Sequence, residues 1–150
     1  MKSTTLLAAV LVSACTALTA APAFAQADFA VKAAAEKGAT VSASGLVYLS
    51  LKDGQGASPA ATDKVKVHYR GTFPDGREFD SSISRGQPAE FPLNRVIACW
   101  TEGVQRMKIG GKARLTCPPA IAYGEKGAGG VIPPNATLQF EVELLSISGR

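Results

Sequence analysis

The chain has 150 residues, of which 16 are Lys or Arg and 12 are Asp or Glu, giving a net charge of +4 at pH 7. Nucleic-acid-binding surfaces carry clustered basic residues, whereas here they are scattered among acids, which argues against that class. The only histidine, His68, excludes an ordinary multi-histidine metal site, and we expect neither a metal nor a cofactor. One hydrophobic core suits a chain of this length.

The first 25 residues have the features of a secretory signal peptide. Lys2 supplies a positive start, Leu6 to Val12 is an uninterrupted apolar run, and Ala23-Phe24-Ala25 places small residues where signal peptidase cleaves. The apolar run is too short to span a bilayer permanently. We therefore predict cleavage after Ala25 and an exported, periplasmic protein with a net charge of +3, because Lys2 is the only charge removed.

A second processing route stays open. Val12-Ser13-Ala14-Cys15 also fits a lipoprotein cleavage box, in which Cys15 would be acylated and retained as the first residue. Lipidation would tether the same domain to a membrane without changing its chemistry.

Residues 26–44 are interpreted as an N-terminal arm. They are rich in Ala, Lys and Glu, and Asp28 to Lys37 is predicted to form a short helix. The arm has too few large apolar residues to build a core or a strong dimer contact, so we expect a monomer.

From Leu46 onward the pattern predicts strands. Leu46 to Leu51 is one strand, and Val65 to Arg70 alternates apolar and polar side chains, as a half-buried strand does. Pro74-Asp75-Gly76 predicts a turn, since Pro presets φ and Gly tolerates positive φ.

The second half of the domain contains two more strands and one helix. Ala113, Leu115 and Cys117 are predicted to face inward, with Arg114 and Thr116 outward. Trp100, Val104 and Met107 recur at helical spacing, which predicts an amphipathic helix over Val96 to Met107. The last strand has four alternating apolar residues: Leu138, Phe140, Val142 and Leu144. Antiparallel strands around one helix make an α+β domain.

Large aromatic residues suggest a binding pocket. Any one of them is more often a core residue, but several stand beside turns and polar side chains, as Phe79 does before Asp80. The sequence has no G-x-S-x-G motif, no Cys/His pair for nucleophilic attack and no phosphate-binding loop. The aromatics are Tyr69, Phe79, Phe91, Trp100, Tyr123 and Phe140.

Several motifs occur in a characteristic order. They are Val67-His68-Tyr69-Arg70-Gly71, Asp75-Gly76, Phe79-Asp80-Ser81-Ser82, Val96-Ile97, Trp100-Thr101-Glu102-Gly103-Val104-Gln105-Arg106-Met107, Gly110-Gly111-Lys112, Ala122-Tyr123-Gly124, Ile132-Pro133-Pro134-Asn135-Ala136-Thr137-Leu138 and Phe140-Glu141-Val142-Glu143-Leu144-Leu145. At this spacing they resemble FKBP-type peptidyl-prolyl cis-trans isomerases, over about Gly45 to Ile147.

The resemblance implies a fold and an activity. The fold is a bent antiparallel sheet wrapped around one short α-helix. The domain with this fold occupies residues 45–150. The activity is rotation of X-Pro bonds in unfolded or partly folded exported proteins. FK506 and rapamycin are the implied inhibitors. A non-catalytic module or chaperone that holds proline-containing segments is the alternative.

The resemblance also implies site residues. The implied catalytic residues are Tyr69, Phe79, Asp80 and Tyr123, and the implied substrate-binding residues are Arg85, Val96, Ile97, Trp100, Val131, Ile132 and Phe140. Two positions depart from the pattern, because Ala89 stands where some members have an aromatic residue and Ala128 where some have histidine.

Cys99 and Cys117 are the two cysteines left after the predicted processing. An even number in an exported chain favours a disulfide. The resemblance places the start of the helix, where Cys99 lies, against the inner face of the strand that carries Cys117. We therefore expect these two residues to be bonded.

Overall fold

A seven-stranded antiparallel sheet forms the body of the protein in a computed structural model that describes residues 23–148. The strand order is β1-β2-β6-β7-β3-β4, and β5 pairs with the other half of the same edge of β3. The strands are β1 (Thr40–Val41), β2 (Val47–Lys52), β3 (Lys64–Thr72), β4 (Glu78–Ser81), β5 (Ala89–Pro92), β6 (Lys112–Cys117) and β7 (Leu138–Ser148).

The central strands follow the predicted alternation. Val65, Val67 and Tyr69 of β3 are buried, and the apolar residues of β7 face the same core. β7 lies between β3 and β6, with Tyr69 opposite Val142 and Leu115 opposite Phe140. Between β3 and β4, the Gly76 N–H donates to the Phe73 carbonyl, so the predicted turn closes a hairpin.

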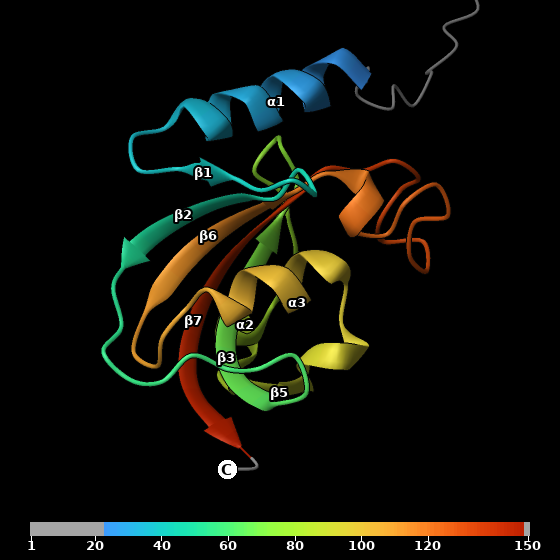
Figure 1. Ribbon diagram of the computed structural model, residues 1–150. Coiled ribbons are helices and arrows are strands. Elements are labelled where there is room, and N and C mark those ends of the chain that lie inside the picture. Colours follow the sequence, from blue (N-terminus) through green and yellow to red (C-terminus); the bar gives the residue numbers. More distant parts are fainter. Residues whose placement is uncertain (1–22, 149–150) are drawn as a thin grey trace, which may run out of the picture.

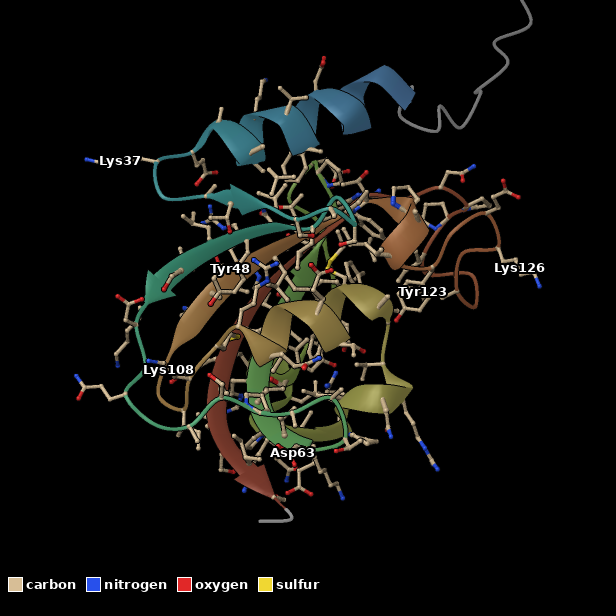
Figure 2. All side chains as sticks on the ribbon, in the orientation of Figure 1. Lys37, Tyr48, Asp63, Lys108, Tyr123 and Lys126 are labelled. Atoms are coloured by element: carbon tan, nitrogen blue, oxygen red, sulfur yellow. A yellow bond between two sulfur atoms is a disulfide. The ribbon has the colours of Figure 1, made fainter. Side chains whose placement is uncertain are left out.

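Helix α3 (Ala98–Gln105) lies against the inner, concave face of the sheet (Figure 1). Trp100 and Val104 are buried there. A Cβ at Gly103 would lie 2.7 Å from a Leu115 methyl carbon, so this glycine lets the helix approach β6 closely. Cys99 and Cys117 form a disulfide with a Cα–Cα distance of 5.8 Å, seen as the yellow bond in Figure 2.

The helix predicted over Val96 to Met107 is shorter than expected. Val96 and Ile97 are extended, with ψ angles of 174° and 149°, because the preceding 3-10 turn η1 (Leu93–Arg95) leads the chain across the sheet before α3 begins. Met107 lies beyond the helix but is still buried in the core.

Helix α1 (Ala23–Ala35) covers the outer face of β2 and β6 (Figure 1). The predicted helix in the arm is therefore present, although it starts earlier and ends before Lys37. Thr116 lies on the outer face of β6, as the alternation predicts, but it is only 1% exposed because α1 covers it together with Val47. Among residues 28–35 of α1, whose side chains the structure describes, Ala33 is the buried one, so a small side chain is sufficient at this contact.

The predicted cleavage site after Ala25 falls in the first turn of α1, whereas the apolar run Leu6–Val12 and Cys15 lie outside the described residues. Within the described part of the chain, no helix combines the length and apolar character that a membrane crossing requires. Two short elements complete the fold: α2 (Ser82–Arg85) and the 3-10 turn η2 (Pro119–Ile121).

Candidate active site

A cavity of about 450 Å³ opens between α3, η1 and the inner face of the sheet. We call it the aromatic pocket. It is lined by Tyr69, Phe79, Asp80, Phe91, Arg95, Val96, Ile97, Trp100, Tyr123 and Phe140. Ligand pockets in proteins have volumes of about 300–1,000 Å³ and mostly apolar walls with a few polar groups, which this cavity matches.

Trp100 lies at the centre of the ring cluster that builds the pocket. Tyr69, Phe91 and Phe140 each meet it edge-to-face, with ring-centroid distances of 5.2, 5.5 and 5.4 Å. Such pairs are favourable because the positive edge of one ring meets the negative face of another. The cluster therefore fixes a rigid, carbon-rich floor that offers bound water few partners.

Gly71 on β3 makes room for this arrangement. It lies opposite Phe140 on β7 and Asp80 on β4. A Cβ there would come within 2.5 Å of the Phe79 ring and 3.0 Å of the Phe140 ring. The missing side chain is what allows Phe79 and Phe140 to pack edge-to-face, with their centroids 5.5 Å apart.

Three polar side chains form a cluster at one wall of the pocket. The Tyr69 hydroxyl donates a hydrogen bond to one carboxylate oxygen of Asp80, and the Arg85 guanidinium forms an ion pair with the other. Arg85 also donates to the Tyr69 hydroxyl oxygen at 3.0 Å. The carboxylate is thereby held in one orientation, with its charge balanced by Arg85.

These contacts determine the protonation states. Partial burial alone would raise the pKa of Asp80, but the hydrogen bonds from Tyr69 and Arg85 and the Arg85 charge outweigh it, so this pKa is lowered. Burial, and then the bond to Asp80, raises the pKa of Tyr69 above its usual value of 10.0. Burial and the Asp80 charge raise that of Tyr123. At neutral pH the site therefore holds one carboxylate and two neutral phenols.

The serines after Asp80 fix the local backbone. Ser81 accepts a hydrogen bond from the Ser84 N–H at 3.2 Å and so caps α2, which carries Arg85 at its end. The buried Ser82 hydroxyl accepts from the Tyr69 N–H at 2.8 Å and contacts His68 Nδ1 at 3.0 Å. Asp80 thus supplies the carboxylate of the pocket, while Ser81 caps the helix that carries Arg85 and Ser82 holds the backbone of Tyr69.

Tyr123 enters the pocket from the loop between η2 and β7, on the right-hand side of Figure 2. It is 40% exposed, so it lies at the mouth of the pocket. The loop is closed by a hydrogen bond from the Asn135 N–H to the Gly124 carbonyl at 2.8 Å and by a bridge between Ala128 and Ile132.

The structure brings most of the predicted site residues together, with three exceptions. Arg85 stands behind the wall and reaches the pocket through Asp80 and Tyr69. Ile132 is buried in the core, and Val131 is 58% exposed on the loop, so neither lines the cavity. Two lining residues, Phe91 and Arg95, were not among the predicted site residues. Phe91 was noted as an aromatic residue, whereas nothing in the sequence pattern singled out Arg95.

A bent antiparallel sheet wrapped on one short helix, with an aromatic cavity between them, defines an α+β binding domain. The chain belongs to the FKBP-type peptidyl-prolyl cis-trans isomerase family, whose profile matches residues 55–145. It is 57% identical over 114 residues to the FKBP-type isomerase FkpA of Aeromonas hydrophila and 53% identical to the FKBP-type 22 kDa isomerase of Escherichia coli K12. Each match covers 76% of this chain but 42% and 55% of those proteins, respectively.

Solved structures give the same result. The crystal structure of FkpA from Escherichia coli matches with a TM-score of 0.79 and 48% identity, over 81% of this chain and 57% of that one. A peptidyl-prolyl cis-trans isomerase from Pseudomonas syringae matches with a TM-score of 0.78 and 40% identity, over 84% of this chain and 92% of that one. The fold is thus the FKBP-like α+β fold that the sequence motifs implied.

Proposed function

We propose that this protein is an exported peptidyl-prolyl cis-trans isomerase that accelerates rotation of X-Pro bonds while other exported proteins fold. The observation that supports this most strongly is the aromatic pocket itself: rigid apolar walls with one oriented carboxylate. Catalysis of this kind needs no covalent intermediate.

The proposed mechanism follows from the electronic structure of the amide. Resonance gives the C–N bond partial double-bond character and a rotation barrier of about 18–20 kcal/mol. Water favours the planar form, because it solvates the partial negative charge on the carbonyl oxygen. An apolar pocket removes that water, so it binds the twisted, less dipolar transition state better than either planar isomer.

Individual residues have different proposed roles. Trp100 supports the proline ring from below, while Phe79 and Phe140 enclose it. Asp80 and the hydroxyls of Tyr69 and Tyr123 orient the twisted imide. Arg85 positions the Asp80 carboxylate, and the exposed Val131 contacts the peptide outside the cavity.

The assay that tests the proposal is isomerisation of a short peptide with an apolar residue before proline. Uncatalysed conversion takes on the order of 10–100 s at 25 °C, which leaves a wide window for detection. The full chain is expressed, and the exported product is purified. We expect faster cis-to-trans conversion and inhibition by FK506 or rapamycin. If micromolar protein binds the peptide without accelerating its conversion, the non-catalytic binding module is the correct function.

The same preparation tests processing. Intact mass spectrometry should show a polypeptide that begins at Gln26. A diacylated product that begins at Cys15 would instead establish the lipoprotein route. Light scattering should give the monomer mass, because residues 26–44 have too few large apolar residues to build a strong dimer contact.

A further inference from the structure

The aromatic pocket contains one charged side chain to which the proposed catalysis assigns no role. Arg95 is the last residue of η1 and lines the cavity next to Val96. Its side chain is exposed, which places it at the rim of the pocket. A cation at the entrance of an otherwise apolar cavity affects which segments enter it.

The charges of the pocket do not balance once Arg95 is counted. Asp80 is the only acidic residue in the lining, and its charge is compensated by the ion pair with Arg85. Arg95 forms no ion pair with any residue in the part of the chain that the structure describes. The site therefore has one uncompensated positive charge.

Arg95 and Asp80 belong to different walls. Asp80 lies beside Tyr69 and Arg85, and its charge raises the pKa of Tyr123 across the mouth. Arg95 lies on the wall built by η1, and Arg85 is the cation that lowers the pKa of Asp80. Because Asp80 is paired with Arg85, the Arg95 guanidinium is available to bind a ligand.

The backbone of that wall is firmly held. Leu93 is fully buried, and its carbonyl accepts a hydrogen bond from the Thr101 hydroxyl of α3 at 2.6 Å. Its N–H donates to the Asp63 carbonyl at 3.0 Å. Thr101 and Trp100 both belong to α3. The backbone that carries Arg95 is therefore held in a fixed position relative to Trp100.

We propose that Arg95 makes the pocket select X-Pro segments that carry an Asp or Glu side chain within about two residues of the proline. Arg95 lines the same cavity, and an extended chain advances about 3.3–3.6 Å per residue, so only residues close to the proline stay near the guanidinium. The inference rests on the proposed function and names its substrate class. Guanidinium binds carboxylate through two parallel hydrogen bonds. Because the pair stays partly solvated, we expect a preference of about two- to fivefold.

The experiment compares peptides that differ only in charge. Two pairs carry Glu or Gln, one pair immediately before proline and the other immediately after it, so that size and shape are matched. Conversion is measured by NMR exchange spectroscopy on the full chain after export, which avoids a helper protease. The quantity read is the Glu-to-Gln ratio of kcat/KM within each variant, so that effects common to all peptides cancel.

The variants are Arg95→Gln, Arg95→Glu and the control Lys108→Gln. Lys108 is also exposed and has no ion pair among the described residues, but it lies on the opposite side of α3 from Tyr123 (Figure 2). Lys108→Gln and Arg95→Gln change the net charge equally. We expect the ratio to fall to about one in Arg95→Gln, to invert in Arg95→Glu and to persist in Lys108→Gln.

Three results would overturn the inference: no preference for Glu in either peptide pair, an unchanged ratio in Arg95→Gln, or an equal loss in Lys108→Gln, which would indicate a general charge effect. If no peptide is converted at all, the proposed function fails instead. Arg95 is then tested by equilibrium binding of the same peptides, followed through the fluorescence of Trp100, the only tryptophan.

Discussion

The two ends of α3 face two cavities of opposite character. At the start of the helix lies the aromatic pocket, and beyond its end lies a smaller cleft of about 280 Å³. We call the second one the basic cleft. It is lined by Tyr48, Ser50, Lys52, Asp53, Gly54, Arg106, Met107, Lys108, Gly111 and Lys112. Tyr48 and Lys108 lie together on the left in Figure 2, away from Tyr123.

The difference lies in what the walls can offer to water. The basic cleft carries four cationic side chains and the hydroxyls of Tyr48 and Ser50, all of which bind water well. The aromatic pocket has ring edges and faces, its carboxylate is already bonded to Tyr69 and Arg85, and its one uncompensated charge, Arg95, stands at the rim. A mechanism that works by removing water from an amide therefore suits the aromatic pocket and not the basic cleft.

The largest expected effect concerns stability. Trp100 is 4% exposed at the floor of the aromatic pocket, whereas Tyr48 is half-buried at the side of the basic cleft. Trp100→Ala should lower the free energy of unfolding by about 3–5 kcal/mol, because it leaves a cavity in the core. Tyr48→Ala should cost clearly less in the same chemical denaturation experiment. Equal losses would mean that the floor of the pocket is not part of the core.

The disulfide should make the two ends of α3 unequal in stability. It closes a loop with a sequence separation of 18 residues, so its removal should lower the free energy of unfolding by about 3 kcal/mol. Hydrogen exchange of the reduced protein should accelerate first around Cys99 and Trp100, near the pocket, and less around Arg106. Uniform acceleration along α3 would contradict a local tether. Alkylation under denaturing conditions, which should leave both cysteines unlabelled before reduction, checks the bond itself.

Substitutions in the aromatic pocket should lower kcat/KM by about tenfold or more relative to substitutions in the basic cleft. A factor of ten corresponds to about 1.4 kcal/mol of transition-state stabilisation. Phe79→Ala, Asp80→Ala and Tyr123→Ala should lower kcat/KM while cooperative thermal unfolding is retained. Lys52→Gln and Lys108→Gln, matched controls in the basic cleft, should not change it. Wild-type rates from folded Asp80→Ala and Tyr123→Ala would show that the catalytic site is elsewhere.

The smallest expected effect is that of pH. The pKa of Asp80 is lowered and those of Tyr69 and Tyr123 are raised, so kcat/KM for an uncharged peptide should be constant from about pH 5 to about pH 9. Because the folded-state pKa of Asp80 is below the unfolded value of about 3.9, its stabilisation is present above that value and is lost as pH falls through the folded-state pKa. A bell-shaped profile near neutrality would contradict these protonation states.

Much of the fold could be predicted from local pattern. β3 and β7 are central strands in which one face is buried, so apolar alternation gave their positions within a few residues. The alternation of a strand does not show which other element covers its outer face. Thr116 faces outward as predicted, but α1, from a distant part of the chain, buries it.

The pocket could be predicted only in part, for a similar reason. Tyr69, Phe79 and Trp100 belong to motifs, and the structure brings them together. Arg95 belongs to no such motif, and its place at the rim depends on Val96 and Ile97 staying extended when helical periodicity suggested a helix. Which charged side chain borders a pocket follows from tertiary geometry, which no local pattern encodes.

The strands at the borders of the sheet have a consequence for aggregation. Unpaired backbone groups along an exposed border strand are a template for pairing with other extended chains. Here β1 pairs with only Val47 and Tyr48 of β2, which leaves residues 49–52 of β2 at that border, and the other border is divided between β4 and β5, with four residues each. A protein whose proposed substrates are unfolded chains thus offers them border segments of only about four residues. Segments this short limit how far an added strand can pair, which disfavours a β-sheet shared with those chains.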